Sequence, residues 1–269
     1  MSFSINHLGN NGHLGNQMFQ YAFVKSMSIK HKRPFYIPPH HVFGKYYYQD
    51  LFSNIDEAFN INCERSMTDY ANLVERFFHF DEDFFENPPE QNINYVGFFQ
   101  SEKYFTHIAG ELRNNDFRFK REIRNACEPM VAEMHNGDCI GIHIRRNDFL
   151  KNPNHPVQPN SYYEKALSEF DKDLPVYVFS DDPEWCMMSL EGQKIFDGDR
   201  FMVSEIGDAY MDLYLLSQCT HHIICNSTFG WWGAWLADSI NVIAPKNWFA
   251  GDCKDHDTKD LYLNHWEVL

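Results

Sequence analysis

Short apolar runs alternate with helical stretches through the second half of the chain, and this alternation restricts the fold more than any other feature. Each run has the length and composition of a buried β-strand, and the runs lie at 139–144, 176–179, 201–203, 222–225 and 242–244. Helices are predicted between them, at 161–171, from 182 onward, at 208–218 and at 229–238. Strands that alternate with helices form a mostly parallel sheet with helices on both faces. The chain is therefore predicted to have an α/β fold.

The first half of the chain has a less regular pattern. Apolar spacing predicts one strand and three helices there, and these lie at 94–99 and at 16–30, 101–113 and 120–134. The Pro-, His- and Tyr-rich stretch 31–70 is predicted to be irregular. Asn136-Gly137 is a turn signal between a helix and a strand. We therefore expect an N-terminal part, 1–135, and a C-terminal part, 136–269.

Two helix starts in the second half carry capping residues. Asp182 is predicted to be an N-cap, with Pro183 at the first helical position. Asn160 is predicted to cap the helix that follows it. Trp231 and Trp235 lie four residues apart, so we expect them to pack in the core from one face of a helix.

Polar segments of unusual chemistry follow the predicted strands or precede the first long helix. In open parallel sheets, ligands bind beyond the carboxyl ends of the strands. The most informative segment, His143–Asp148, places Arg145 and Arg146 where a buried strand ends. Arginines in such a place need an anion or a carboxylate, and the guanidinium fits phosphate oxygens. The pair is predicted to clamp a diphosphate; the alternative is structural ion pairs with Asp148 or other acids.

Three other segments also follow predicted strands or precede the first long helix. The glycine-containing loop 9–17 leads into a helix N-terminus, where free N–H groups favour anions, although a plain capping turn explains it equally well. Asp181 follows a strand and is predicted to bind the hydroxyls or the base edge of a ligand. Hydrogen-bond donors at the start of another helix are expected from Asn226, Ser227 and Thr228.

The charge balance limits the class of partner. The 23 Lys and Arg against 38 Asp and Glu give a formal net charge of −15, which argues against a binder of nucleic acid or of anionic membranes. Residues 136–269 hold 10 of the basic and 21 of the acidic residues, so their charge is 10 − 21 = −11. A diphosphate bound there would depend on a few local groups.

Cysteine usage and the N-terminus indicate a cytoplasmic location. The seven cysteines form no C-x-x-C pair and are expected to be reduced thiols. The first residues lack the pattern of a signal peptide, and no apolar run is long enough to span a bilayer.

Taken together, the segments resemble one family, the bacterial α-1,2-fucosyltransferases of glycosyltransferase family 11. The resemblance covers nearly the whole chain and rests on six segments in the same order, at 12–22, 143–148, 179–182, 212–219, 226–236 and 245–248. It implies a GT-B-like fold of two Rossmann-type lobes with parallel sheets and a cleft between them. The lobe 1–135 would serve the acceptor and the lobe 136–269 would bind GDP-fucose.

The resemblance implies an activity as well. The enzyme would move L-fucose from GDP-β-L-fucose to the 2-hydroxyl of a β-galactoside, with inversion, in glycan or polysaccharide synthesis. No cofactor or metal would be required. Asp-x-Asp pairs, which hold a metal in many sugar transferases, occur here four times. None follows a clear buried strand, and coincidence in so acidic a chain explains most of them, so a metal site is the minor alternative. The partners would be GDP-fucose and an oligosaccharide with β-galactose, with peripheral association to a lipid-linked glycan.

Individual roles also follow from the resemblance. Arg145 would neutralise the leaving diphosphate, assisted by Arg146, and His143 and Asp212 would contact the guanine. The residues implied near the phosphates or the fucose are Gly15, Asn16, Gln17, Ser227 and Thr228.

Several points stay open at the level of sequence. Asp148 and His155 are the nearest candidates for a general base, which must lie within about 3 Å of the acceptor hydroxyl. The stretches 34–48 and 152–159 are expected to shape the acceptor site. The alternatives are a transferase with another linkage or donor sugar, and a non-catalytic glycan-binding protein, which the 16% aromatic content suggests.

Overall fold

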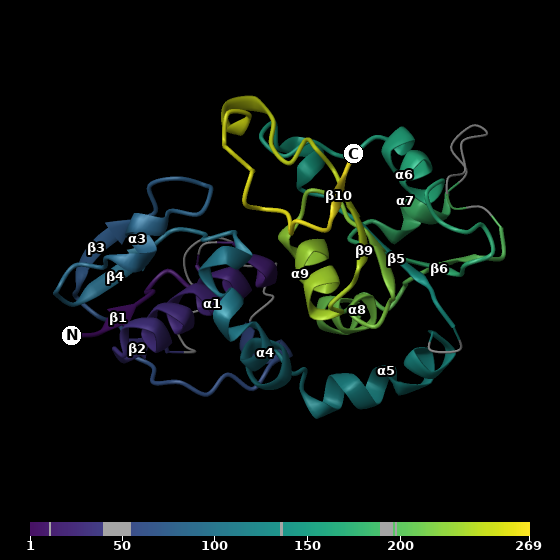
Figure 1. The fold of residues 1–269 in the computed structure, drawn as a ribbon. Helices are drawn as coiled ribbons and strands as arrows, with labels where there is room; N and C mark the ends of the chain where they lie inside the picture. The colour runs from purple at the N-terminus through teal and green to yellow at the C-terminus, as the bar shows by residue number, and fades with distance from the viewer. Residues whose placement is uncertain (11, 40–54, 135–136, 189–195, 197) are drawn as a thin grey trace. The chain divides into compact units, whose positions relative to one another are not determined.

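The computed structural model describes residues 1–10, 12–39, 55–134, 137–188, 196 and 198–269 (Figure 1). These residues form two compact units, of which the first is Met1–Lys120 with His256–Leu263 and the second is Arg121–Asp255 with Asn264–Leu269. The division predicted at Asn136 lies outside the described residues.

A six-stranded parallel sheet forms the centre of the second unit, in the order β10-β9-β8-β5-β6-β7 (Figure 1). Its strands are β5 (Ile140–Ile144), β6 (Val176–Ser180), β7 (Phe201–Val203), β8 (His221–Ile223), β9 (Asn241–Ala244) and β10 (Glu267–Val268). The chain runs from β5 outward to β7 and then returns to β8 on the other side of β5. The connections after β5 and β8 therefore diverge at a topological switch point, where open α/β sheets bind ligands.

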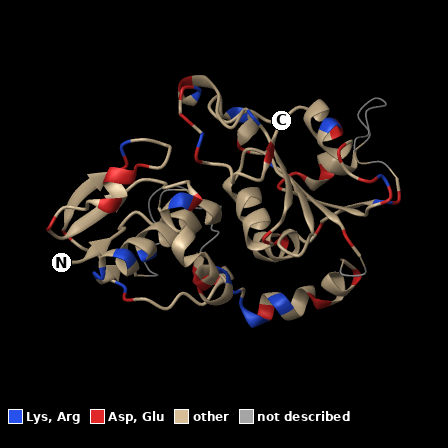
Figure 2. Ribbon diagram, viewed as in Figure 1, with Lys and Arg blue, Asp and Glu red and all other residues tan. Residues whose placement is uncertain are grey.

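Helices cover both faces of this sheet, and the α/β prediction is confirmed. They are α5 (Arg121–Met134), α6 (Asn160–Leu167), α7 (Pro183–Met187), α8 (Ala209–Leu216) and α9 (Thr228–Leu236). The isoleucines of β5 pack against Tyr162, Tyr163 and Ala166 of α6 on one face. On the other face α8 and α9 approach β5, and α5 packs against α8. Figure 2 shows charges of both signs on α5 and none on α9.

The apolar character of α9 agrees with its burial. Trp231, Trp232 and Trp235 are all at most 1% exposed, so the prediction that these tryptophans pack in the core is confirmed. Their rings lie 5.0–6.3 Å apart, centre to centre.

One of the two capping predictions is correct. Asp182 accepts a hydrogen bond from the backbone N–H of Trp185 at 3.2 Å, and Pro183 is the first residue of α7. The Asn160 prediction is wrong, because α6 begins at Asn160 itself and Pro159 is the residue before the helix. The ring of Pro159 fixes its φ at −71°, and its extended ψ of 157° ends the preceding loop one residue earlier than expected.

A smaller parallel sheet forms the first unit, in the order β2-β1-β4-β3. Its strands are β1 (Phe3–Ser4), β2 (Phe35–Tyr36), β3 (Ala71–Val74) and β4 (Ile93–Val96), and its helices are α1 (Leu14–His31), α2 (Ile55–Ala58), α3 (Glu82–Glu86) and α4 (Ala109–Glu111). The C-terminal segment His256–Leu263 belongs to this unit, where Asp260 pairs with Lys103 at 2.5 Å and accepts the backbone N–H of Phe80 at 3.1 Å.

Two predictions for the first unit need correction. The single helix predicted over 101–113 is instead a series of short turns, namely 3-10 helices Glu102–Tyr104 and Thr106–Ile108, then α4, then the π-helical Leu112–Asp116. Burial explains the break, because the Tyr104 ring packs edge-on to Phe23 at 5.1 Å. The stretch 31–70 contains β2 and α2, and residues 40–54, where part of the acceptor site is predicted, lie outside the described residues.

Close packing of α8 against α9 generates a first prediction. A Cβ atom at Gly233 would lie 2.4 Å from Cδ2 and 2.6 Å from Cγ of the buried Leu216. Gly233→Ala should therefore lower the free energy of unfolding by about 1–3 kcal/mol, measured by chemical denaturation.

Gly137→Ala is the matched control, because nothing lies within 4 Å of a Cβ at that position. We expect its stability to stay within about 0.5 kcal/mol of the wild type. Adding Leu216→Ala to Gly233→Ala should cost less than the sum of the single changes, since the clashing atoms are then gone. Fully additive losses would contradict the close contact.

Candidate active site

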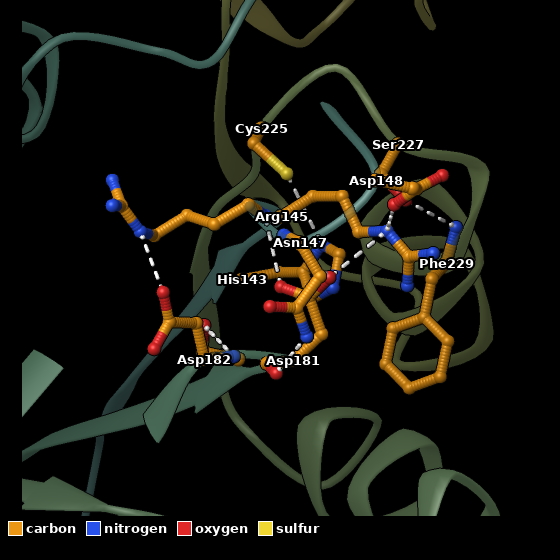
Figure 3. A network of polar contacts seen from close by, with 11 residues as sticks. His143, Arg145, Asn147, Asp148, Asp181, Asp182, Cys225, Ser227 and Phe229 are labelled. Carbon is orange, nitrogen blue, oxygen red and sulfur yellow. Dashed lines mark hydrogen bonds and ion pairs between the residues drawn. The ribbon is translucent and has the colours of Figure 1, made fainter. Parts of the chain in front are cut away.

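His143 is the polar side chain of β5, and it is buried, with 4% of its surface exposed. Its ring stacks on Phe229 of α9 with centroids 4.9 Å apart, and its Nδ1 lies 3.3 Å from the Cys225 sulfur (Figure 3). Gly230 makes this approach possible, because a Cβ there would stand 2.8 Å from Nδ1. Burial, with a further contribution from the Arg145 charge, lowers the pKa of His143 to about 3, so the imidazole is neutral.

Arg145 follows β5 and is held by two carboxylates. Its Nε donates to Asp148 at 2.8 Å and lies 3.3 Å from Asp181, and Figure 3 shows both acids beside this side chain. All of these contacts use Nε. The two terminal nitrogens of the guanidinium donate to no atom of the residues that the structure describes. Its side chain is 22% exposed, so a planar pair of donors remains available at the carboxyl end of the sheet.

Arg146 points in another direction and is enclosed by α7. Its Nε donates to Asp182 at 3.0 Å, and its guanidinium carbon stands 3.9 Å from the centre of the Trp185 ring. This is the structural ion pair that the sequence left as an alternative, strengthened by a cation–π contact. The predicted role of Arg146 on the phosphates stays a prediction.

Asp181 shapes the loop that carries the arginines. One carboxylate oxygen accepts the backbone N–H of Arg146 at 2.8 Å, and the other accepts that of Asn147 at 3.2 Å. The amide of Asn147 in turn donates to the backbone carbonyl of Asp181 at 2.5 Å. Both oxygens of Asp181 are therefore occupied by the chain itself, and its predicted contact with a ligand stays a prediction.

The residues predicted at the start of α9 have local roles. Ser227 is the N-cap and accepts the backbone N–H of Phe229 at 3.4 Å, and Thr228 is the first helical residue. Asn226 is buried, accepts from the Gln158 amide at 2.8 Å and donates to the carbonyl of Trp248 at 3.0 Å. Asn226 thus fastens the loop after β8, and only Ser227 and Thr228 remain at the helix N-terminus.

The two candidates for the general base lie on the segment after β5. Asp148 is 45% exposed and its contact is Arg145. The His155 ring stands between Phe149 and Phe249, with centroid distances of 5.1 and 5.5 Å, and its Nδ1 is buried without a hydrogen-bond partner among the described residues. Burial lowers the pKa of His155, which keeps the ring neutral.

Asp212 belongs to the first turn of α8, whose N-cap is Asp208. Ser204 donates its hydroxyl to the Asp212 carboxylate at 2.6 Å. Burial raises the pKa of Asp212 to about 6, which outweighs the opposite effect of the Ser204 hydrogen bond. A buried carboxyl group whose pKa is raised lowers the stability of the folded chain at neutral pH, and such groups are typical of functional sites.

The remaining predicted site residues lie in the first unit, at the start of α1. Gly15 and Asn16 are in the first turn, and Asn16 accepts a hydrogen bond from the Gln100 amide at 3.0 Å. Gln17 accepts the backbone N–H of Ile55 at 2.9 Å, so its carbonyl supports α2. Their contacts with a ligand stay predictions.

Within the described ranges, no three His, Cys, Asp or Glu side chains gather in a way that would hold a metal ion. Of the helices in those ranges, none is both long and apolar enough to cross a membrane.

The fold is that of GT-B glycosyltransferases. The structure of NodZ α-1,6-fucosyltransferase soaked with GDP-fucose, a protein also solved from Bradyrhizobium, aligns with a TM-score of 0.57 and 15% identity, over 93% of this chain and 97% of NodZ. POFUT1 in complex with GDP aligns with a TM-score of 0.52 and 12% identity, over 90% and 98% of the two chains. The fold prediction is therefore confirmed.

The sequence carries the assignment further. A family model described as Glycosyl transferase family 11 matches residues 2–269, and the chain belongs to that family. The O-antigen biosynthesis glycosyltransferase WbnK of Escherichia coli is 34% identical over 166 residues, which are 55% of this chain and 53% of WbnK, so that match spans about half of each protein.

Two further relatives match over most of this chain. An α-1,2-colitosyltransferase of Escherichia coli is 27% identical over 267 residues, covering 88% of this chain and 90% of the relative. The galactoside α-(1,2)-fucosyltransferase 1 of Rattus norvegicus is 26% identical over 265 residues, covering 86% and 63%.

Some residues of the site were missed from the sequence. Trp185 contacts Arg146 and Gln158 contacts Asn226 from distant positions in the sequence, and Cys225 is predicted only to end a strand. The one available signal was that Cys225 immediately precedes Asn226-Ser227-Thr228, so that a thiol stands at the carboxyl end of a strand.

Asp212 generates a second prediction. Its pKa rises from 3.8 to about 6 on folding, so the folded chain binds this proton more tightly than the unfolded chain. That contribution to stability is complete below about pH 4 and is lost as the pH rises through about 6. Asp212→Asn keeps an acceptor for Ser204 but does not titrate. Relative to wild type, the variant should gain up to about 3 kcal/mol in free energy of unfolding between pH 4 and 7. A difference that stays constant across this range would contradict the assignment.

Proposed function

We propose that this chain transfers L-fucose from GDP-β-L-fucose to the 2-hydroxyl of a β-galactoside, forming an α-1,2 linkage with inversion at the anomeric carbon. Relatives named as galactoside α-(1,2)-fucosyltransferases, which match over 86% of this chain, support the donor and the linkage. The observation that carries the proposal is the Arg145 guanidinium, fixed through Nε at the switch point of the sheet with its terminal nitrogens available.

Charge development explains why this arrangement suits the reaction. The bond from the anomeric carbon to the β-phosphate oxygen breaks, and its electron pair leaves with GDP. The acceptor hydroxyl forms the new bond from the opposite face of the sugar and loses its proton. Negative charge therefore grows on the diphosphate in the transition state, and a preorganised cation stabilises that state more than the bound substrate. Arg145 supplies the cation, and the backbone N–H groups at the start of α9 supply further donors.

The neighbouring groups divide the remaining tasks. Asp148 and Asp181 hold Arg145 through Nε, so that the two terminal nitrogens face one diphosphate rather than rotating freely. His143 is neutral and offers one ring nitrogen to the guanine, while Asp212 offers a carboxylate to the donors of its base edge. The acceptor proton passes to Asp148 or His155, and no metal takes part. The reaction is proposed to occur in the cytoplasm, on oligosaccharides that include lipid-linked glycans.

Arg145 variants test this mechanism. Arg145→Ala and Arg145→Lys should each lower kcat by about 10²–10³, because a lysine offers a single point charge instead of a planar pair of donors. Circular dichroism and the unfolding midpoint should show that both variants fold.

Arg200→Lys is the matched control. Arg200 also contacts an aromatic ring, that of Phe201 at 5.0 Å, but it precedes β7 at the opposite edge of the sheet. The control should retain wild-type turnover. Near-normal turnover in either Arg145 variant would overturn the proposed clamp.

Colitosyl transfer is a second candidate, favoured by the α-1,2-colitosyltransferase that this chain matches over 90% of its length. Colitose is L-fucose without the 3-hydroxyl, so the two donors share the same diphosphate. We expect incubation with GDP-L-fucose and a panel of β-galactosides to yield an α-1,2-fucoside, with the linkage read by NMR, and GDP-L-colitose to be the poorer donor in direct competition.

The possible products separate the candidates. Transfer from GDP-L-colitose alone would select the second candidate, and a fucoside at another hydroxyl would contradict the proposed linkage. Turnover of neither donor with any acceptor would contradict the proposed function.

A further inference from the structure

Cys225 contacts His143 of β5 and lies three residues before the start of α9 in the chain. It lies two residues after the end of β8, is buried, and its backbone N–H donates to the carbonyl of His143 at 3.2 Å. Its sulfur stands 3.3 Å from Nδ1 of His143 (Figure 3). The pairing of neighbouring chain segments thus brings the thiol and the imidazole into contact.

The direction of the hydrogen bond follows from the surroundings of the sulfur. The sulfur is buried, and its contact is Nδ1 of His143 at 3.3 Å. Burial holds the pKa of Cys225 well above its usual range, so the thiol keeps its proton. A protonated thiol has an S–H to donate, and an unprotonated imidazole nitrogen is a better hydrogen-bond acceptor than a thiol sulfur.

The consequence concerns the other ring nitrogen of His143. A neutral imidazole carries one proton, and if Nδ1 accepts from the thiol, that proton sits on Nε2. Nε2 makes no hydrogen bond within the described part of the chain, and it is not among the polar atoms sealed from solvent. A donor with no protein partner, in a side chain only 4% exposed, is costly unless a ligand supplies an acceptor.

Packing keeps the ring in this position. Phe229 stacks on one face of the imidazole, and the absence of a side chain at Gly230 leaves just enough room for Nδ1. A ring turned by 180° would place the Cδ2 carbon opposite the Cys225 sulfur and would lose this hydrogen bond.

We infer that Cys225 is a positioning residue: its thiol holds His143 as the Nε2–H tautomer, which presents a hydrogen-bond donor to an acceptor atom of the bound nucleoside diphosphate. The identity of the ligand rests on the proposed function, whereas the tautomer does not.

The first test reads the tautomer directly in the free protein. Nitrogen-15 NMR of the histidine rings, with His143→Gln to assign the signal, should show Nε2 protonated and Nδ1 unprotonated at pH 7. Cys225→Ser should keep this pattern, because a hydroxyl also donates to Nδ1, whereas Cys225→Ala should give a mixture of tautomers. A wild-type spectrum with the proton on Nδ1 would overturn the inference.

The second test measures GDP affinity by titration calorimetry. Cys225→Ala should weaken GDP binding about three- to tenfold, the usual size of one hydrogen bond, and Cys225→Ser should largely restore it. Cys219→Ala is the matched control, since Cys219 is also buried beside β5 but its sulfur faces the carbonyl of Leu215 instead of a histidine. Its GDP affinity should equal that of wild type.

A double-mutant cycle shows whether the effect passes through His143. In a His143→Ala background, the further change Cys225→Ala should leave GDP affinity unchanged. The same loss in both backgrounds would overturn the positioning role. Failure of wild type to bind GDP at all would instead contradict the proposed function, and the NMR result would still decide the tautomer.

Discussion

Burial of β5 on both faces determines where each charged group of the site can stand. Its isoleucines are sealed by α6 and its opposite face by α8 and α9, so polar side chains are tolerated only where the strand ends. His143 is the exception inside the sheet, and it remains there as a neutral ring. Arg145, one step further along, reaches the edge and keeps its charge beside two carboxylates. A ligand bound at the switch point of the sheet could meet both residues.

The local arrangement also reconciles an acidic chain with an anionic ligand. The formal net charge is −15, yet the acids nearest the arginines bind the chain itself. The two carboxylate oxygens of Asp181 accept backbone N–H groups of the loop, and one of them also lies beside Arg145. Asp182 caps α7 and accepts a hydrogen bond from Arg146. These carboxylates orient cations and N–H groups, so their charge is partly neutralised before a ligand arrives. Electrostatic attraction of an anion to this site is therefore short-ranged and directional.

Local patterns in the sequence predicted most of the second unit and less of its site. Its buried parallel strands have continuous apolar runs, which predict strands. Asp182 directly before Pro183 predicts a helix N-cap followed by the first helical residue. The strand β10, Glu267–Val268, has no such run and was missed. Cys225 and His143 lie 82 residues apart, and their contact arises only when β5 and β8 pair. No local signal encodes contacts of that kind, which is why ligand-facing residues were easier to name than those that orient them.

The path of the C-terminal segment has a consequence for how the protein can be made and divided. The chain enters the second unit at Arg121, returns to the first at His256 and goes back at Asn264 to add β10. Asp260 is then a late partner for Lys103 and Phe80, which are synthesised long before it. Neither unit is a contiguous module that one cut could release. During synthesis on the ribosome, the first unit must wait for residues 256–263 before its structure is complete.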